Sequence, residues 1–393
     1  MINTIKSLLG NSKLSKIQPF DFSMLEIPQI ISFFLHCFIQ EKKEYLLVVE
    51  TRQLAEDFYQ ILNSQENASP VRLYTGHDHK LYSSILSSEG LLQQRLQILY
   101  TLFLQKKNGQ QPFPLITTLE DLFLLTPPVS FFEEHYHPIH VEDILSPQDL
   151  ISLLQRYGYI QAPIVDSPGN YCLKGEILDF YAHEGPVRLS YFDEIIESIY
   201  LIDEENNKTI KNSPLSLIHP LPSSQVFAHR QSNFASTFRN RLPSSASQQR
   251  FFQQWRQQTL SNLESGILFP QYPLFAPLFF QQNETLLSFW DEKTPLLLAF
   301  SDDLKTEEEN FYAKLKEERL SYLDSPERLQ NPVYLPAPEN LFLENWPKAL
   351  ESFRGFKLKK SSAGATPSAL PLFSYLSEFF LKRNIASKNQ KQD

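Results

Sequence analysis

The chain has 393 residues, of which 42% are hydrophobic and 21% are charged. This composition supplies enough apolar surface for folded cores, and the length is typical of two or three domains, which excludes a wholly disordered protein. The 36 Lys and Arg residues are outnumbered by 45 Asp and Glu residues, so the formal net charge is −9. A surface built mainly to neutralise nucleic-acid phosphates is therefore not expected.

Targeting and membrane signals are weak. The first ten residues lack the long apolar core and cleavage pattern of a signal peptide, and the only cysteines are Cys37 and Cys172. Both features predict a cytoplasmic protein. The most apolar stretch, residues 27–39, is interrupted by polar residues and is shorter than the roughly 20 residues that a membrane span needs. We expect a buried helix there and no membrane partner.

Short apolar runs alternate with amphipathic helices in the first third of the chain. Three strand and helix pairs are expected, with strands at 45–50, 71–74 and 115–117 and helices at 51–65, 91–104 and 119–123. Apolar residues in these helices recur at three- and four-residue intervals, which gives each helix one buried face. Alternation of this kind predicts a parallel sheet covered by helices.

The pattern changes after Thr126, where two consecutive prolines favour extended backbone and remove hydrogen-bond donors. A helix is predicted with Ser146 as its N-cap, Pro147 as its first residue and Gly158 at its end. Residues 162–222 then show short runs of period two, separated by turn sequences at 167–170, 183–186 and 204–207. This segment is expected to be a small sheet with one leading helix.

The strand and helix rhythm returns after residue 223. We expect a helix over 247–263, strands at 285–289 and 295–300, and a charged helix from the cap at 301–303 to residue 320. Residues 351–393 carry eight Lys or Arg residues against three acidic ones, and a run rich in small residues at 361–368 indicates a linker, with a short helix at 373–382.

These patterns predict a mixed α/β protein with an interrupted domain. One α/β domain with a parallel sheet is expected from two sequence segments, residues 1–127 and 223–350. A small α+β insert domain, mostly β, is expected at 128–222 between them. Residues 351–393 are expected to form a flexible tail.

Motifs for cofactors, metals and catalysis are missing or weak. Neither G-x-x-x-x-G-K-[ST] nor G-x-G-x-x-G occurs, so no cofactor and no ATP hydrolysis are expected. No G-x-S-x-G motif or thiol-enzyme context occurs, so no catalytic residue is expected. The clustered histidines raise the alternative of a metal hydrolase; they are His77, His79, His135, His137 and His140. Extended backbone would put His135 and His137 on one face and His140 on the other, so we expect no metal.

The most informative stretch is residues 156–203. It contains R-Y-G-Y at 156–159, S-P-G-N-Y-C-L-K-G-E-I-L-D-F at 167–180 and P-V-R-L-S-Y-F-D-E-I-I-E-S-I at 186–199. These motifs, at nearly fixed spacing, resemble the insert domain shared by the excision-repair protein UvrB and the transcription-repair coupling factor (Mfd). A weaker resemblance, which includes Q-R-L-Q-I-L at 94–99, extends over about residues 20–350.

The ATP-binding loop and the tyrosine-rich DNA-clamping hairpin of UvrB are both missing from this sequence. The resemblance is therefore to the N-terminal, UvrB-like, non-ATPase module of the coupling factor, and implies a degenerate UvrB/helicase-like α/β fold. In that family the RNA-polymerase-binding domain and the DNA translocase follow this region, and neither fits in 393 residues. The sequence is expected to be a fragment or a split version, reaching RNA polymerase and DNA only through regions absent here.

The resemblance also implies a partner, UvrA, and a site on one face of the insert sheet. In the family this site has two basic residues and an aromatic one, which correspond by motif to Lys174, Arg188 and Phe192. The family usually has Arg where Lys174 stands. Lysine keeps the charge but loses the bidentate fork of a guanidinium.

Strand geometry gives an independent reason to examine these residues. Period two sends Val187, Leu189 and Tyr191 to one side of the strand, and Arg188, Ser190 and Phe192 to the other. The first side would be buried, which leaves a cation and an aromatic ring exposed together. Arginine beside an aromatic ring is typical of energetically important positions in protein interfaces.

The neighbouring strand is expected to place Leu173 and Ile177 inward and Lys174 and Glu176 outward, which would bring Lys174 beside Arg188. A purely structural alternative remains open. In it, Arg188 pairs with an acid such as Glu176 across the strands, and the aromatic ring only caps the sheet edge.

The sequence therefore predicts a non-catalytic module that, as the resemblance implies, recruits UvrA in transcription-coupled nucleotide-excision repair. The alternative is a UvrB-like, nucleotide-dependent protein that binds damaged DNA through an unrecognised site. Binding of DNA would weaken steeply with salt, whereas the recruitment hypothesis needs no nucleotide.

Overall fold

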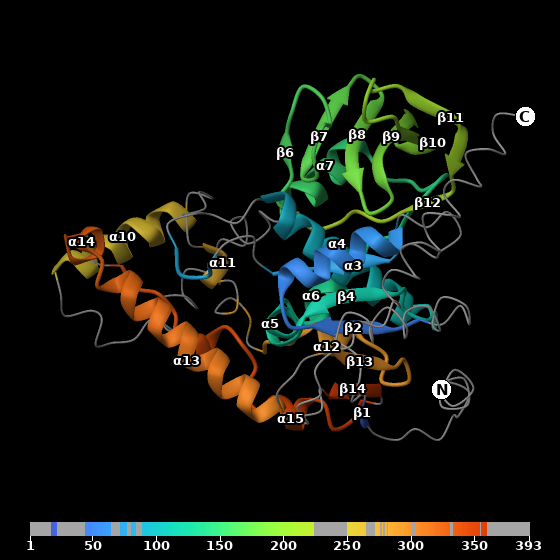
Figure 1. Cartoon of the computed structure of the whole chain (residues 1–393). Helices are drawn as coiled ribbons and strands as arrows, with labels where there is room; N and C mark the ends of the chain where they lie inside the picture. The colour runs from blue at the N-terminus through green and yellow to red at the C-terminus, as the bar shows by residue number, and fades with distance from the viewer. Residues whose placement is uncertain are drawn as a thin grey trace, which may run out of the picture.

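The computed structural model describes residues 17–21, 44–63, 71–76, 80–83, 89–223, 250–264, 272–275, 277, 280, 282–299, 303–330, 333–353 and 355–359. In this part of the chain a parallel α/β body lies below a β-rich insert (Figure 1). The helices expected at 27–39 and 373–382, the linker at 361–368, Cys37, and His77 and His79 lie outside the described residues.

Six described strands form the parallel sheet of the body. Their order is β1 (Ile17–Asp21), β14 (Gly355–Lys359), β13 (Leu296–Ala299), β2 (Leu46–Val49), β4 (Leu115–Thr118) and β3 (Arg72–Tyr74). β13 pairs in parallel with β2, so a strand from after the insert lies beside one from before it. Both strands are apolar and fully buried, as expected for a sheet covered on both faces. The prediction of a mixed α/β protein with a parallel sheet is confirmed.

The body also contains helices, some of which pack on the sheet while others extend away from it (Figure 1). They are α3 (Arg52–Asn63), α4 (Glu89–Lys107), α5 (Leu119–Phe123), α6 (Val129–Glu134), α10 (Arg250–Glu264), α11 (Tyr272–Phe275), α12 (Leu286–Phe289), α13 (Leu304–Leu323), α14 (Pro326–Gln330) and α15 (Trp346–Ala349). α13 begins at an Asp303 cap, whose carboxylate accepts hydrogen bonds from the backbone of Lys305 and Thr306. The helices predicted around α3, α4, α5, α10 and α13 are therefore present.

The strand expected at 285–289 is wrong. These residues form the short helix α12, with Thr285 as its N-cap and with Leu286, Leu287 and Phe289 buried. α12 contacts α4 and α5, so its apolar side chains fill a space between helices and not a sheet position. A short apolar run does not distinguish a buried strand from a buried helical turn, and here tertiary packing decides.

Residues before and after the insert also meet outside the sheet. The ring of Trp346 stacks on that of Phe123, with centroids 4.5 Å apart and planes at 9°. The backbone N–H of Leu343 donates to the carbonyl of Phe123 at 2.9 Å. One core therefore contains side chains from both flanking segments.

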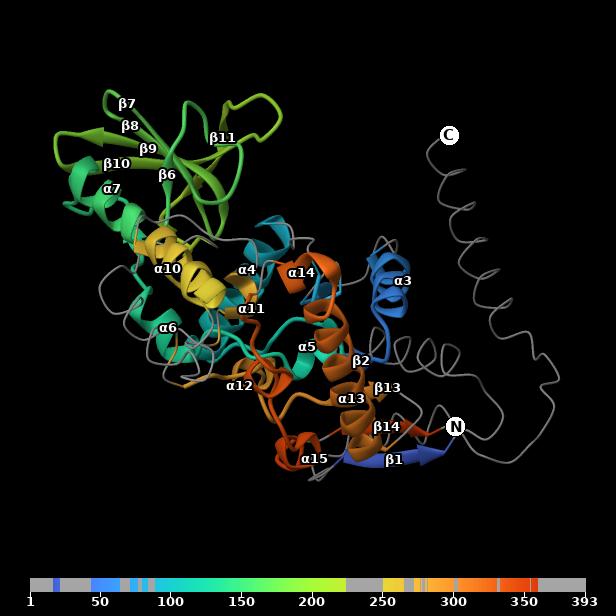
Figure 2. The same ribbon diagram turned by 90° about the vertical axis from the view of Figure 1, so that its left-hand side faces the viewer.

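The insert is a second six-stranded sheet with one covering helix. Its strand order is β11 (Thr209–Leu215), β10 (Ile195–Ile202), β9 (Gly185–Phe192), β8 (Ile177–Ala182), β7 (Asn170–Lys174) and β6 (Ile160–Gln161). A two-stranded pair, β5 (Ile139–His140) and β12 (Leu217–Ile218), lies at its base. Helix α7 (Pro147–Arg156) covers one face of the sheet, and the opposite face is turned to the viewer in Figure 1 (Figures 1 and 2). The predicted β-rich insert is present.

Helix α7 forms as its sequence predicts. The Ser146 hydroxyl accepts a hydrogen bond from the backbone of Asp149 at 3.1 Å, and Pro147 occupies the first helical position. Leu150 and Leu154 face the sheet and are buried. Gly158 follows the helix with φ 85°, a conformation that favours glycine. α7 thus closes the inner face of the sheet, and the residues pointing the other way remain outside.

The insert rests on helix α4 of the body (Figure 1). The side chain of Gln93 donates to the carbonyl of Pro222 at 3.2 Å, and that of Gln97 to the carbonyl of His183 at 3.4 Å. Tyr100 of the same helix contacts the rings of His183 and His219. Among the described helices, none has the length and apolar character needed to span a membrane.

Candidate functional site

Strand β9 divides its side chains between the two faces of the insert sheet as period two predicts. Val187, Leu189 and Tyr191 are buried against the core under α7. On the outer face the Phe192 side chain is 71% exposed. The aromatic ring is therefore available to solvent and is not part of the insert core.

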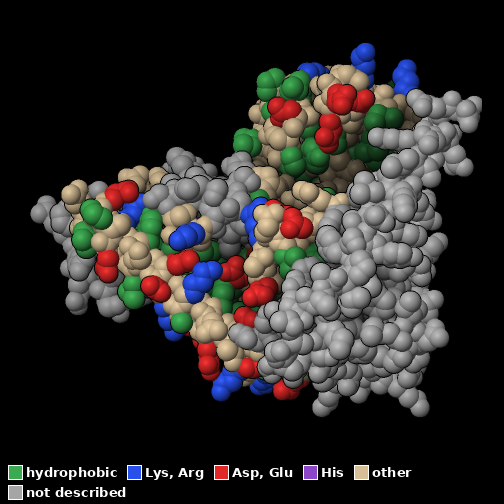
Figure 3. Space-filling view, viewed as in Figure 1, with side chains coloured by type: hydrophobic (Ala, Val, Ile, Leu, Met, Phe, Trp, Pro, Cys, Tyr) green, Lys and Arg blue, Asp and Glu red, His purple; other side chains and the backbone are tan. Residues whose placement is uncertain are grey.

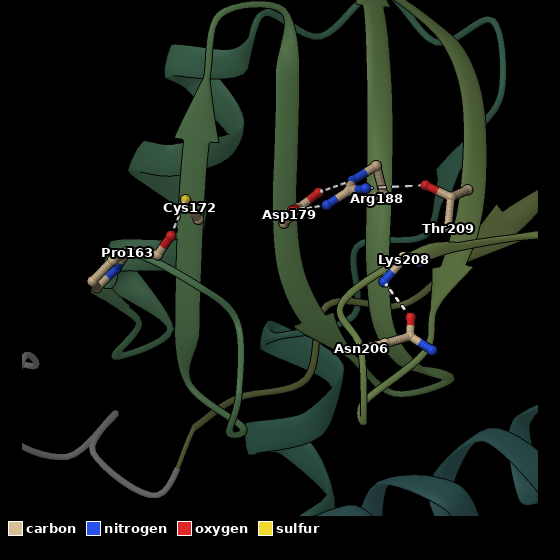
Figure 4. Close-up of polar contacts among 7 residues, drawn as sticks. All are labelled: Pro163, Cys172, Asp179, Arg188, Asn206, Lys208 and Thr209. Carbon is tan, nitrogen blue, oxygen red and sulfur yellow. Dashed lines mark hydrogen bonds and ion pairs between the residues drawn. The ribbon is translucent and has the colours of Figure 1, made fainter.

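Arg188 lies on the outer face and is held by two neighbours (Figure 4). Its Nε and Nη2 donate to Oδ1 and Oδ2 of Asp179 on β8 at 2.8 and 2.7 Å, and its Nη1 donates to the Thr209 hydroxyl at 3.0 Å. The hydrogen bonds to Asp179 raise the pKa of Arg188 further above its ordinary value, so this group stays cationic. The ion-pair partner is therefore Asp179. It is not Glu176, which the sequence analysis gave as an example of an acid that could pair with Arg188.

The expectation that Ile177 points inward is wrong, because its side chain is 38% exposed. Lys174 ends β7, Ile177 begins β8, and the two residues are paired across a two-residue turn in which Gly175 has φ 62°. Directly paired residues in antiparallel strands project to the same face, so Ile177 shares the outer face with Lys174. Leu173 pairs with the buried Leu178 and faces inward, as expected.

The strand register places the three predicted site residues on one face of the sheet. They lie in different rows, where a row is a set of residues paired across neighbouring strands. Arg188 is paired with Asp179 on β8, whereas Lys174 is paired with Ile177, which is in turn paired with Ser190. Lys174 therefore lies one row further along the sheet than Arg188, with β8 between them. Phe192 lies one row beyond Ser190 on β9. The structure brings these residues onto a common surface without bringing Lys174 into contact with Arg188.

The three described histidines of the cluster point to different partners. His135 packs on the Phe131 ring and its Nδ1 lies 2.7 Å from the Phe131 carbonyl oxygen, His137 contacts the Tyr157 hydroxyl, and His140 lies 3.6 Å from Asp143. Within the residues that the structure describes, no group of three His, Cys, Asp or Glu side chains is placed to hold a metal ion. Each histidine thus has a local structural partner.

Sequence reasoning missed Asp179, the residue that fixes Arg188. Its signal was present in the L-D-F sequence of β8, where an acid stands between two buried residues, Leu178 and Phe180. Such an acid faces the outer side of the sheet, where a cation on the next strand can neutralise it. The hairpin between Ala182 and Gly185 sets the register that makes Arg188 this cation.

Comparison with known proteins identifies sequence relatives of the insert and of the longer chain. Residues 138–223 match the family model of the UvrB interaction domain, so the insert is of this class. Over most of its length the chain is similar to transcription-repair-coupling factors. It is 25% identical to that of Escherichia coli (strain K12) over 309 residues and 26% identical to that of Haemophilus influenzae over 341 residues. It is 22% identical to that of Bacillus subtilis (strain 168) over 296 residues.

These matches cover 74%, 82% and 71% of this chain, respectively, but only 25%, 27% and 25% of the relatives. The chain thus spans about a quarter of the length of the curated relatives it matches. A UvrB interaction domain within a longer region similar to these factors supports a module like the N-terminal part of Mfd.

Proposed function

We propose that this chain is a non-catalytic recruitment module that binds UvrA in transcription-coupled nucleotide-excision repair. The observation that carries the proposal is the outer face of the insert, where Phe192 is 71% exposed within a domain of the UvrB interaction class. Among the described helices, α7 covers the opposite face (Figure 2), so the outer face of the six-stranded sheet would receive the partner. The proposed module would act in the cytoplasm, without a cofactor.

Each of the three residues has a distinct role in this proposal. Phe192 supplies the apolar anchor, since a large exposed ring loses its contact with water only when a partner covers it. Lys174 is an exposed cation and makes no ion pair with the described residues, so it is available to a carboxylate of UvrA.

Arg188 has a more constrained role. Each terminal guanidinium nitrogen carries two hydrogens, and one hydrogen on each is used by Asp179 or Thr209. The remaining hydrogens are available, and 23% of the side chain is exposed. The ion pair holds the guanidinium in one orientation before the partner arrives, which reduces the ordering cost of binding.

The test is the affinity of the purified chain for purified UvrA, measured calorimetrically with and without ATP. We expect binding without ATP, and we expect Phe192→Ala and Lys174→Ala each to weaken it by more than about 1 kcal/mol. Lys293→Ala is the matched control, because Lys293 is an exposed lysine of the body, remote from the insert sheet. Unchanged affinity in both site variants would refute the site, and binding only with ATP would favour the UvrB-like alternative.

A further inference from the structure

Three exposed apolar side chains form a row across the end of the insert sheet. Ile144, just before α7, makes an antiparallel bridge with Ile195 at the start of β10, and Ile195 is paired with Phe192 at the end of β9. Paired residues project to the same face, so these three side chains lie side by side. Ile144 is 78% exposed and Ile195 is 40% exposed. We call this row the apolar ladder.

The insert core does not account for the apolar ladder. Ile196, the residue after Ile195, is fully buried, so β10 already supplies its core side chain at this level. On the other side, Leu145 and Leu150 pack in the core at the start of α7, the positions of a hydrophobic staple around the Ser146 cap. Ile144 lies one residue too early for this contact. Single exposed apolar residues are ordinary, whereas three in register form a continuous patch.

Acidic residues border the apolar ladder. They are Asp143 beside Ile144, Asp193 and Glu194 in the turn between Phe192 and Ile195, and Glu197 in β10. Asp143 is half-buried, and the other three are exposed. Backbone hydrogen bonds from Leu145 to Glu194 and from Ile196 to Asp143 fix this border in place. In the space-filling view, hydrophobic and acidic side chains gather on the face of the insert turned to the viewer (Figure 3). The cations lie away from this border: Arg188 is four residues before Phe192 on β9, and Lys174 is on β7, two strands from β9.

We infer that the apolar ladder is the centre of the UvrA-binding surface proposed above, on which this inference rests, and that it receives an apolar patch of UvrA bordered by basic residues. The ladder is continuous with Phe192, and the acidic border is complementary to basic side chains of the partner. Interfaces typically place apolar anchors at the centre and charges at the rim. Ile144 and Ile195 are thus contact residues additional to the three identified from the motifs.

The test compares Ile144→Ser and Ile195→Ser with Ile160→Ser in UvrA binding by the full chain. Ile160 is 49% exposed on β6, at the far edge of the same sheet, so its replacement removes a similar apolar side chain from outside the ladder. We expect Ile144→Ser and Ile195→Ser each to raise the dissociation constant by about tenfold. Ile160→Ser should change it less than about twofold. Far-ultraviolet circular dichroism and thermal unfolding would verify that each variant is folded.

A charge variant tests the acidic border separately. Glu194→Gln combined with Glu197→Gln keeps side-chain size and removes two negative charges, and it should slow association with UvrA at low salt. The difference from the wild-type chain should shrink as salt is added, because screening weakens charge steering. Equal association rates at low salt would refute the basic character assigned to the partner patch.

The outcomes separate this inference from the proposed function. Failure of the wild-type chain to bind UvrA would overturn both. Weakening by Phe192→Ala, with full affinity retained in Ile144→Ser and Ile195→Ser, would overturn the ladder alone. Sedimentation equilibrium tests a further outcome, in which the wild-type chain is a dimer. If Ile144→Ser dissociated this dimer without changing the affinity for UvrA, the ladder would be a contact with a second copy of this chain. That result would refute the inference.

Discussion

Arg188 and Asp179 face each other on adjacent strands, and two parallel hydrogen bonds of 2.8 and 2.7 Å join the guanidinium to the carboxylate. The Asp179 side chain is only 6% exposed, so its carboxylate takes its hydrogen bonds from this partner and not from bulk water. Arg188 therefore supports the insert sheet whether or not it contacts another protein. Any binding experiment on Arg188 must be read together with the stability of the insert.

Arg188→Ala should lower the free energy of unfolding by about 1–3 kcal/mol, because it leaves a largely buried carboxylate without its hydrogen-bond donors. Urea denaturation followed by circular dichroism measures this change. The double variant Asp179→Ala with Arg188→Ala removes both partners and should recover part of the loss. If Asp179→Ala lowered the free energy of unfolding of the Arg188→Ala variant as much as it lowers that of the wild-type chain, the two residues would contribute independently. That result would contradict this account of the pair.

Phe192→Ala and Phe180→Ala form a matched pair on the two faces of one sheet. Phe192 is exposed, so its truncation should change the free energy of unfolding by no more than about 0.5 kcal/mol. Phe180 is fully buried in the insert core, and its truncation should cost about 3–5 kcal/mol. Thermal or urea unfolding distinguishes the two, and similar losses in both variants would mean that Phe192 is packed in solution.

The faces of β9 were predictable from sequence because one uninterrupted strand has a strict period of two. Counting by the same period from Leu173 across the hairpin gave the wrong side for Ile177, since the two-residue turn makes Lys174 and Ile177 partners. The register of β8 against β9 also selected Asp179 as the partner of Arg188. Such pairings depend on turn geometry and not on the pattern within one strand.

Long-range packing was the other part that local pattern did not determine. Residues 285–289 have the apolar content of a strand but form α12 between α4 and α5. The Ile144 and Ile195 bridge joins residues that are far apart in the sequence of the insert, and no single-strand pattern marks it. By contrast, the Ser146 cap and the body strand and helix pairs rest on local signals, and these were predicted correctly.

Trp346→Ala should destabilise the body by about 3–5 kcal/mol, because Trp346 is buried and stacks on Phe123 across the two flanking segments. The indole Nε1 also donates to the Leu343 carbonyl at 2.7 Å. Urea unfolding monitored by the fluorescence of the other tryptophans, Trp255 and Trp290, measures the loss. Lys348→Ala, an exposed replacement in the same short helix, is the control. A urea midpoint for Trp346→Ala equal to that of the wild-type chain would show that the contact between the two segments does not stabilise the body.

Acid should weaken the junction between the insert and α4 through His183. Burial lowers the pKa of His183 from its ordinary value of 6.5 to about 4, against the smaller opposing effect of Glu184 and with added repulsion from His219 and Arg72. Between these two pH values the unfolded chain holds more protons than the folded one, so the free energy of unfolding falls as the pH falls. The ring packs against Tyr100, and its buried Nδ1 has no hydrogen-bond partner among the described residues.

His183→Gln removes this titration and should therefore flatten the loss of stability between pH 6.5 and pH 4. Urea midpoints measured across this range for the wild-type chain and the variant give the two slopes. His140→Gln, a replacement of a more exposed imidazole on β5, controls for the removal of one histidine. Equal slopes in wild-type and His183→Gln proteins would mean that His183 titrates alike in the folded and unfolded chains. Its burial against Tyr100 would then not be what makes the junction sensitive to acid.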